Sequence, residues 1–136
     1  MTRMVDLDQL VALSDARYRR EQQSIQRILA EETRLRSALK QLDDQMRDSR
    51  GNGNLEQRTL GADMLWQGWI GRKKTELNQQ LARLMVIKEQ SLVQVRKAYG
   101  KLLVSEQMHT DARAVQKKKR GKAALDQAIE ISLSLE

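Results

Sequence analysis

The chain has 136 residues, with no proline, no cysteine and no phenylalanine, and its aromatic content is 3%. The length allows one domain, the lack of cysteine excludes disulfides and thiolate chemistry, and the scarcity of aromatic residues argues against a thick globular core. The formal net charge is +7. Residues 1–48 contain equal numbers of acidic and basic residues, so the positive excess falls on residues 49–136.

Residues 4–48 are expected to form the first helix, because apolar residues recur at alternating steps of four and three and glycine is absent. The positions of this stripe are Leu7, Val11, Ser14, Tyr18, Glu21, Ile25, Ile28, Glu32, Leu35, Leu39, Leu42 and Met46. We expect Leu10, Leu13 and Leu29 to widen the stripe, as packing within a hairpin requires.

A glycine-rich break, Arg50-Gly51-Asn52-Gly53-Asn54, lies in a connection expected over residues 49–61. Glycine and asparagine tolerate the positive φ angles that tight turns need. The chain is therefore expected to fold back here, as one all-α domain over residues 1–136. The predicted architecture is a long antiparallel two-helix coiled-coil hairpin, with Asp63 placed to cap the helix after the break.

Residues 62–120 are expected to form the second helix, with its apolar residues turned toward the first. These residues are Trp66, Trp69, Ile70, Leu77, Leu81, Leu84, Leu92, Val95, Tyr99, Leu102 and Leu103. From Leu81 onward an eleven-residue repeat describes the spacing better than a heptad, which predicts a locally loosened or reversed left-handed supercoil. Gly68 and Gly71 flank Trp69, which indicates close packing or a bend at that point.

Residues 121–136 are expected to form a C-terminal tail that is partly helical or frayed. Its first half, from Ala124 to Ile129, favours a short amphipathic turn, whereas Ile131 to Leu135 alternates like a strand. Just before the tail stands the basic run Lys117-Lys118-Lys119-Arg120-Gly121-Lys122. A solvated terminus and a site for an acidic partner are both open interpretations of this run.

The residue patterns predict no enzyme, no metal site and no cofactor. His109 is the only histidine, and no carboxylates accompany it at ligand spacing. The Gly51-Asn52-Gly53 segment lacks the strand and the Gly-Lys-Ser/Thr ending of a phosphate-binding loop. Glu31 and Glu32 point in different directions on a helix, so they are not an acid–base pair. There is no apolar run of the roughly 18 residues that cross a bilayer, so a cytoplasmic location is expected.

Trp66 and Trp69 lie one helical turn apart, and two interpretations of them are open. In the first, they pack in the core against Leu42 and Met46 and clamp the hairpin. In the second, part of this patch is exposed and anchors a partner, because tryptophan is enriched at interface hot spots.

These features resemble the FliJ family of flagellar type III export proteins and the related stalk proteins of virulence type III secretion systems. The resemblance rests on the hairpin plan, the Gly/Asn loop near residue 52, the opening Leu65-Trp66-Gln67-Gly68-Trp69-Ile70 and the basic stretch leading to Ala124-Leu125-Asp126-Gln127. Lys73 departs from the family pattern, which favours an aliphatic residue there, and Gly68 and Gly71 interrupt the start of the second helix.

The resemblance implies a non-enzymatic central stalk of an export apparatus, located in the cytoplasm and peripheral to the inner membrane. The implied partners are the hexameric export ATPase ring, the export-gate membrane protein and export chaperones. Candidate gate-binding residues are Leu42, Met46, Trp66, Trp69, Ile70 and Leu77. Candidate ATPase-binding residues are Arg113, Lys117, Lys118, Lys119, Arg120 and Lys122.

Two functions of other classes are alternatives to the stalk. The Lys117–Lys122 run favours a basic coiled coil that associates with nucleic acid or an anionic membrane, but no aromatic residues interleave with it to stack on bases. A self-assembling scaffold, in which the arms pair between chains, would also suit the helical pattern. The position of the break favours the stalk, because it is expected to put Trp66 and Trp69 at one tip of a rod and the basic run near the other.

Overall fold

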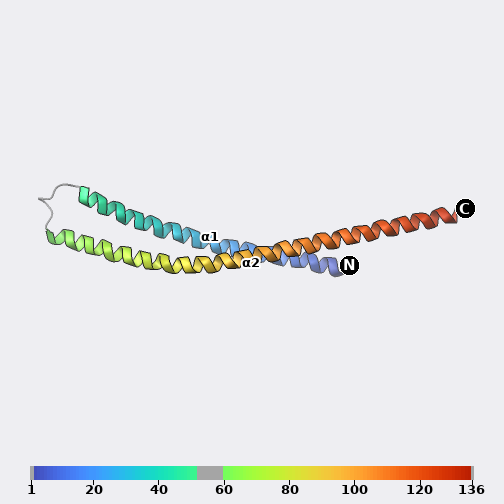
Figure 1. Cartoon of the computed structure of the whole chain (residues 1–136), viewed down its shortest axis with the longest axis horizontal. Helices are drawn as coiled ribbons and strands as arrows, with labels where there is room; N and C mark the ends of the chain where they lie inside the picture. The colour runs from blue at the N-terminus through green and yellow to red at the C-terminus, as the bar shows by residue number, and fades with distance from the viewer. Residues whose placement is uncertain (1, 52–59, 136) are drawn as a thin grey trace. The chain divides into compact units, whose positions relative to one another are not determined.

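A computed structural model of the protein describes residues 2–51 and 60–135. Two α-helices account for almost all of them: α1 spans Thr2–Gly51 and α2 spans Leu60–Ser134 (Figure 1). The helices pack against each other as a helical hairpin, which confirms the expected all-α fold. Asp43 of α1 pairs with Lys74 of α2 and Glu32 pairs with Lys88, so the helices are antiparallel. The connection expected over residues 49–61 is shorter, because residues 49–51 belong to α1 and residues 60–61 to α2; residues 52–59 lie outside the described residues.

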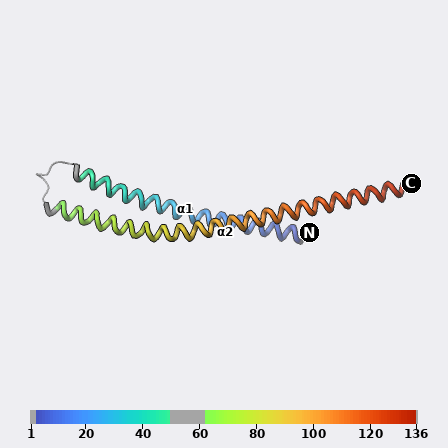
Figure 2. The backbone as a smooth tube through the Cα atoms, viewed as in Figure 1, coloured from blue at the N-terminus to red at the C-terminus, as the bar shows by residue number. Residues whose placement is uncertain are grey.

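The bounds of α2 differ from the expected ones at both ends. The helix begins at Leu60, so Asp63 lies in its first turn and does not cap it. In the first turn its carboxylate still interacts favourably with the positive end of the helix dipole. It continues to Ser134, past the expected end at residue 120 and without a strand-like segment (Figure 2). The physical reason is composition, because alanine, leucine, lysine and glutamine are strong helix formers and Gly121 stands alone among them.

The buried side of α1 follows the predicted stripe. Every stripe position from Leu7 to Met46 is buried or half-buried, which confirms the alternating steps of four and three. The predicted widening is wrong, because Leu10, Leu13 and Leu29 are 39%, 69% and 42% exposed. A single facing helix covers only a narrow seam, and a wider apolar stripe needs a further layer to cover it.

The buried side of α2 follows the same alternating steps of four and three, and the predicted eleven-residue repeat fails at Leu103. Buried or half-buried side chains at alternating steps of four and three are Ile70, Lys74, Leu77, Leu81, Leu84, Lys88, Ser91, Val95, Ala98, Leu102, Ser105, His109, Ala112 and Gln116. The pattern was hidden because several of these positions are polar. Leu103, which the repeat placed inward, is 46% exposed, and Ser105 is buried at 2% exposure.

One compact part of the chain is Gln22–Gln94, which includes segments of both helices. Its core is a cluster of buried aliphatic side chains, Leu35, Leu42, Ile70 and Leu77, with Ala38, Leu39, Met46, Leu81 and Leu84 packed against them. Leu35 and Ile70 are 1% and 0% exposed, and full burial of such a side chain stabilises by about 1.5–3 kcal/mol. A Cβ atom on Gly71 would meet no atom within 4 Å, so the close packing expected beside Trp69 is absent at this glycine.

The other compact part consists of Met1–Glu21 and Val95–Glu136. Of the described residues in this part, the buried ones are Leu7, Ala98, Leu102 and Ser105. The rings of Tyr18 and Tyr99 lie 5.2 Å apart at a tilt of 44°, a favourable aromatic arrangement. Further along this part, His109 of α2 contacts Asp8 of α1 through Nε2 and Oδ1.

Candidate partner-binding surfaces

The candidate gate-binding residues separate into a buried and an exposed group. Leu42, Ile70 and Leu77 are buried in the core of the 22–94 part, and Met46 is half-buried against it. These side chains hold α1 to α2 and offer little surface to another molecule. Trp66 and Trp69, in contrast, are 40% and 44% exposed.

The two tryptophans pack on each other and not in the core. Their rings are stacked, with centroids 5.4 Å apart and planes 15° from parallel. Met64 and Leu65 beside them are 72% and 74% exposed. We call Leu65, Trp66 and Trp69 the indole patch; Met64 lies on another side of the helix, because two residues correspond to about 200°. Of the two open interpretations, the exposed patch agrees with this geometry, whereas a clamp buried against Leu42 and Met46 does not.

The indole patch has the chemistry of a protein-binding anchor. Exposed apolar side chains grouped on one turn of helix mark interaction surfaces, and tryptophan contributes most to such interfaces. Stacking fixes both rings before a partner arrives, so little side-chain freedom remains to be lost on binding. The Arg72 guanidinium lies close to this part of the helix. Its Nη1 is 3.6 Å from the position that a Cβ atom would occupy if Gly68 had one. The patch therefore combines flat apolar rings with a basic neighbour.

The candidate ATPase-binding residues are all exposed on α2. We call Arg113, Lys117, Lys118, Lys119, Arg120 and Lys122 the basic arm. In the described part of the chain, none of these side chains makes an ion pair. Their charge is therefore available to attract an acidic surface and to speed its approach.

An open groove of about 500 Å³ runs beside the basic arm, within the part formed by residues 1–21 and 95–136. Its apolar lining comes from Met4 and Leu7 of α1 and from Met108, Ala112 and Val115 of α2. Arg3, Asp111, Gln116 and Lys119 complete its lining. Methionine adapts its shape readily, so this groove can accept an apolar side chain of a partner whose acidic groups meet the basic arm.

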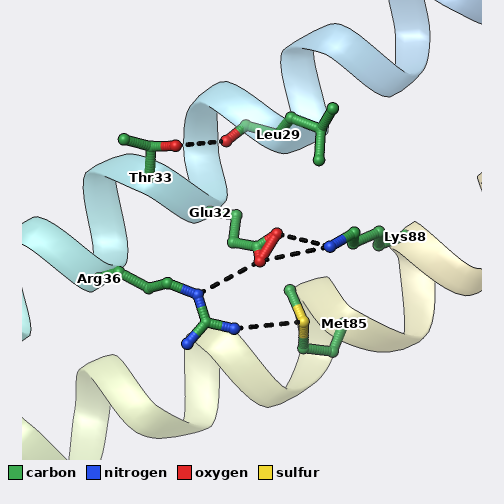
Figure 3. Close-up of polar contacts among 6 residues, drawn as sticks. All are labelled: Leu29, Glu32, Thr33, Arg36, Met85 and Lys88. Carbon is green, nitrogen blue, oxygen red and sulfur yellow. Dashed lines mark hydrogen bonds and ion pairs between the residues drawn. The ribbon is translucent and has the colours of Figure 1, made fainter.

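Glu32 is a feature that the apolar pattern alone did not single out (Figure 3). It occupies a seam position of α1 at 9% exposure, where its Oε1 accepts a hydrogen bond of 2.8 Å from Nζ of Lys88 on α2. Its Oε2 accepts another of 3.3 Å from Nε of Arg36, whose Nη2 contacts the Met85 sulfur at 3.9 Å. The hydrogen bond from Lys88 is the main reason that the pKa of Glu32 lies below its ordinary value, against the opposing effect of burial.

The Glu32–Lys88 pair bears on alignment and not on catalysis. A charged pair across a helical seam is satisfied in one register only, which is the best-attested role of buried polar groups in coiled coils. A signal for it was present in the sequence. Glu32 stood in the first apolar stripe as a charged residue, which indicated a partner across the seam. Lys88 was not indicated as that partner, because pairing the arms about residues 50–54 would put residue 72 opposite Glu32.

His109 is a half-buried seam residue in contact with Asp8. Within residues 2–51 and 60–135, no group of three or more histidine, aspartate or glutamate side chains is arranged to hold a metal ion. Over the same residues, neither helix has a stretch apolar and long enough to cross a bilayer.

Comparison with protein-family models, with curated proteins and with solved structures finds no match to this chain. The indole patch, the basic arm and the groove beside it are therefore the features from which a function is inferred.

Proposed function

We propose that this protein is a non-enzymatic central stalk of a type III protein export apparatus of the flagellar kind, which couples the export ATPase ring to the export gate. The observation that carries the proposal is the presence of two chemically different exposed surfaces on one helical hairpin. The indole patch is apolar and aromatic, whereas the basic arm is cationic, and they belong to different compact parts of the chain. A coupling protein needs two such surfaces, because it binds two partners at once.

The proposed gate contact is the indole patch. Leu42, Ile70 and Leu77 hold the hairpin together, so their share in gate binding is indirect: they fix the helix that presents Trp66 and Trp69. In this proposal the protein works in the cytoplasm at the inner membrane, reaches the membrane only through the gate, and also meets export chaperones.

The proposed ATPase contact is the basic arm together with the adjoining groove. Unpaired lysine and arginine side chains suit an acidic surface inside a ring, because electrostatic attraction speeds association and orients the bound protein. The groove lined by Met4 and Met108 gives the same partner a place for an apolar anchor.

The proposal is tested by the ATPase activity of the cognate purified export ATPase, titrated with the full chain. We expect the chain to bind and to raise the turnover rate. A variant with glutamine at all six positions of the basic arm is expected to lose most of this effect. The matched control is W66A/W69A, which changes the other surface and is expected to stimulate as the native chain does. If the native chain neither binds nor stimulates the enzyme, the stalk function is wrong.

The exposure of the basic arm also favours a second candidate, association with nucleic acid or an anionic membrane. This candidate predicts binding to duplex DNA or to vesicles containing phosphatidylserine that weakens steeply as salt rises. The same glutamine variant would lose that binding. No binding at low salt would exclude this candidate and leave the stalk unaffected, so the two functions are separable.

A further inference from the structure

The last part of α2 carries an apolar surface that nothing in the hairpin covers. Every side chain from Lys117 to Leu135 is exposed, so the buried seam of α2 ends at Gln116. The uncovered stretch nevertheless contains large apolar side chains: Leu125, Ile129, Ile131, Leu133 and Leu135 are 61%, 48%, 55%, 66% and 82% exposed.

This apolar surface lies on a different side of α2 from the seam. Continuing the seam beyond Gln116 by steps of three and four reaches Lys119, Ala123, Asp126, Glu130 and Leu133, three of which are charged. Leu125, Ala128 and Leu135 each fall two positions after a seam position, and two residues correspond to about 200° around a helix; Ile129 and Ile131 lie to either side of them. The side of α2 that packs on α1 and the apolar side of residues 124–135 therefore point in nearly opposite directions. We call the latter the distal face; its residues are Ala124, Leu125, Ala128, Ile129, Ile131 and Leu135.

The spacing of the distal face fits a helix. Leu125, Ala128, Ser132 and Leu135 follow steps of three and four, which is the spacing of a coiled-coil seam. Small side chains between the large ones allow a second helix to approach closely. A membrane surface fits less well, because residues 100–136 contain no aromatic residue and the basic residues gather at one end of the face.

The charged side chains beside the distal face indicate the charge that its partner carries. Lys117, Lys118 and Lys122 lie seven residues before Ala124, Leu125 and Ile129, so they share the same side of the helix. The acids of this stretch, Asp126 and Glu130, fall on the seam side. If the distal faces of two copies of the chain packed together, each lysine would face another lysine or an apolar side chain. No acidic side chain would be in place to pair with these lysines.

We propose that the distal face of α2 docks an amphipathic helix of a partner protein, and that the partner's apolar stripe ends in acidic residues that meet Lys117, Lys118 and Lys122. This docking goes beyond the stalk function and does not depend on it, although it uses Lys117, Lys118 and Lys122 of the basic arm. The bound helix would cover the apolar side chains of the distal face, and its acidic side chains would pair with the lysines that precede this face.

The proposal is tested by measuring the fluorescence anisotropy of a designed helical peptide as the full chain is added to it. The probe carries leucine and alanine at coiled-coil spacing and a glutamate cluster at one end, and a matched peptide carries lysines in place of the glutamates. We expect the acidic peptide to bind at least about tenfold more tightly than the basic one near 0.1 M salt. L125S/I129S is expected to abolish binding, and K117Q/K118Q/K122Q to remove the preference between peptides. The matched control D126N/E130Q changes the seam side and is expected to bind as the native chain does.

Circular dichroism checks that each variant stays helical. We expect this result because all the substituted positions are exposed. Equal binding of the two peptides, or no loss in L125S/I129S, would overturn the proposal. Binding to anionic phospholipid vesicles that is lost in L125S/I129S would replace it with a membrane-binding helix. A dimer in light scattering that L125S/I129S dissociates would replace it with self-association.

Discussion

Polar side chains in the seam decide which residues of α1 face which residues of α2. Leucine and isoleucine tolerate several alignments of two helices, because one apolar side chain can replace another. The Glu32–Lys88 pair has no such freedom, since a shift of either helix would leave a charge in the seam without its partner. The seam therefore gains its cohesion from aliphatic residues and its alignment from charged ones.

The pH dependence of stability tests the role of Glu32. Its pKa in the folded protein lies below the ordinary value of 4.5, mainly through the hydrogen bond from Lys88. The resulting stabilisation is complete above 4.5 and is lost as the pH falls through the lower, folded-state pKa. We expect urea unfolding of E32Q to depend less on pH below 4.5 than that of the native chain.

The matched control for this measurement is E31Q. The pKa of Glu31 is also lowered, chiefly by a hydrogen bond from Arg34 on its own helix. Removing that exposed intrahelical pair is expected to change the unfolding midpoint less than E32Q does at neutral pH. A larger effect of E31Q would contradict the importance given to the pair between helices.

Two serines of α2 differ in how their hydroxyl groups are satisfied. The Ser105 hydroxyl donates a hydrogen bond of 2.8 Å to the Leu102 carbonyl, whereas the Ser91 hydroxyl oxygen is buried without a hydrogen-bond partner. An unsatisfied buried polar group costs about 1–3 kcal/mol. We expect S91A to raise the free energy of unfolding by about 1 kcal/mol more than S105A, since both gain equally in helix propensity. Equal effects in denaturant unfolding would show that the Ser91 hydroxyl carries no penalty.

At the scale of the helices, the narrow seam explains which leucines matter. Leu35 is 1% exposed and Leu13 is 69% exposed, although both belong to the apolar residues of one helix. We expect L35A to lower the free energy of unfolding by about 2–5 kcal/mol and L13A to change it by about 0.5 kcal/mol or less. Denaturant unfolding of the two variants measures both values. A comparable cost for L13A would mean that the stripe on α1 is wider than the structure shows.

The sequence was sufficient to predict the buried seam of α1 but not that of α2. In α1 most seam positions are apolar, so steps of four and three were visible and every stripe position proved at least half-buried. In α2 the seam passes through Lys74, Lys88, Ser91, Ser105 and His109. Periodicity of apolar residues cannot reveal a seam in which so many positions are polar, and an eleven-residue repeat that places Leu103 inward was predicted instead.

The exposure of the tryptophans was the other point that pattern alone left open. A helical period places Trp66 and Trp69 on one side of α2, but it does not say whether α1 covers them. The structure shows that Ile70 fills the seam at this level and that the indoles stack on each other outside it. Knowledge of three-dimensional packing was needed to distinguish the exposed indoles from the core.

At the scale of the whole molecule, the hairpin presents three surfaces that its own packing leaves uncovered: the indole patch, the basic arm and the distal face. Each has its own chemistry, and none contributes to the core of the 22–94 part. Variants of these surfaces are therefore expected to alter binding while leaving the thermal midpoint nearly unchanged, as is usual for exposed positions.

The central claim is that one chain binds the export ATPase and the export gate at the same time. Co-sedimentation of the cognate ATPase with the cytoplasmic domain of the gate protein, with and without the full chain, measures this directly. The account predicts a complex of all three proteins that forms only when the chain is present. It also predicts that W66A/W69A loses the gate domain but keeps the ATPase, and that the basic-arm glutamine variant loses the ATPase but keeps the gate domain. Failure of the native chain to bring the two partners together would contradict the account.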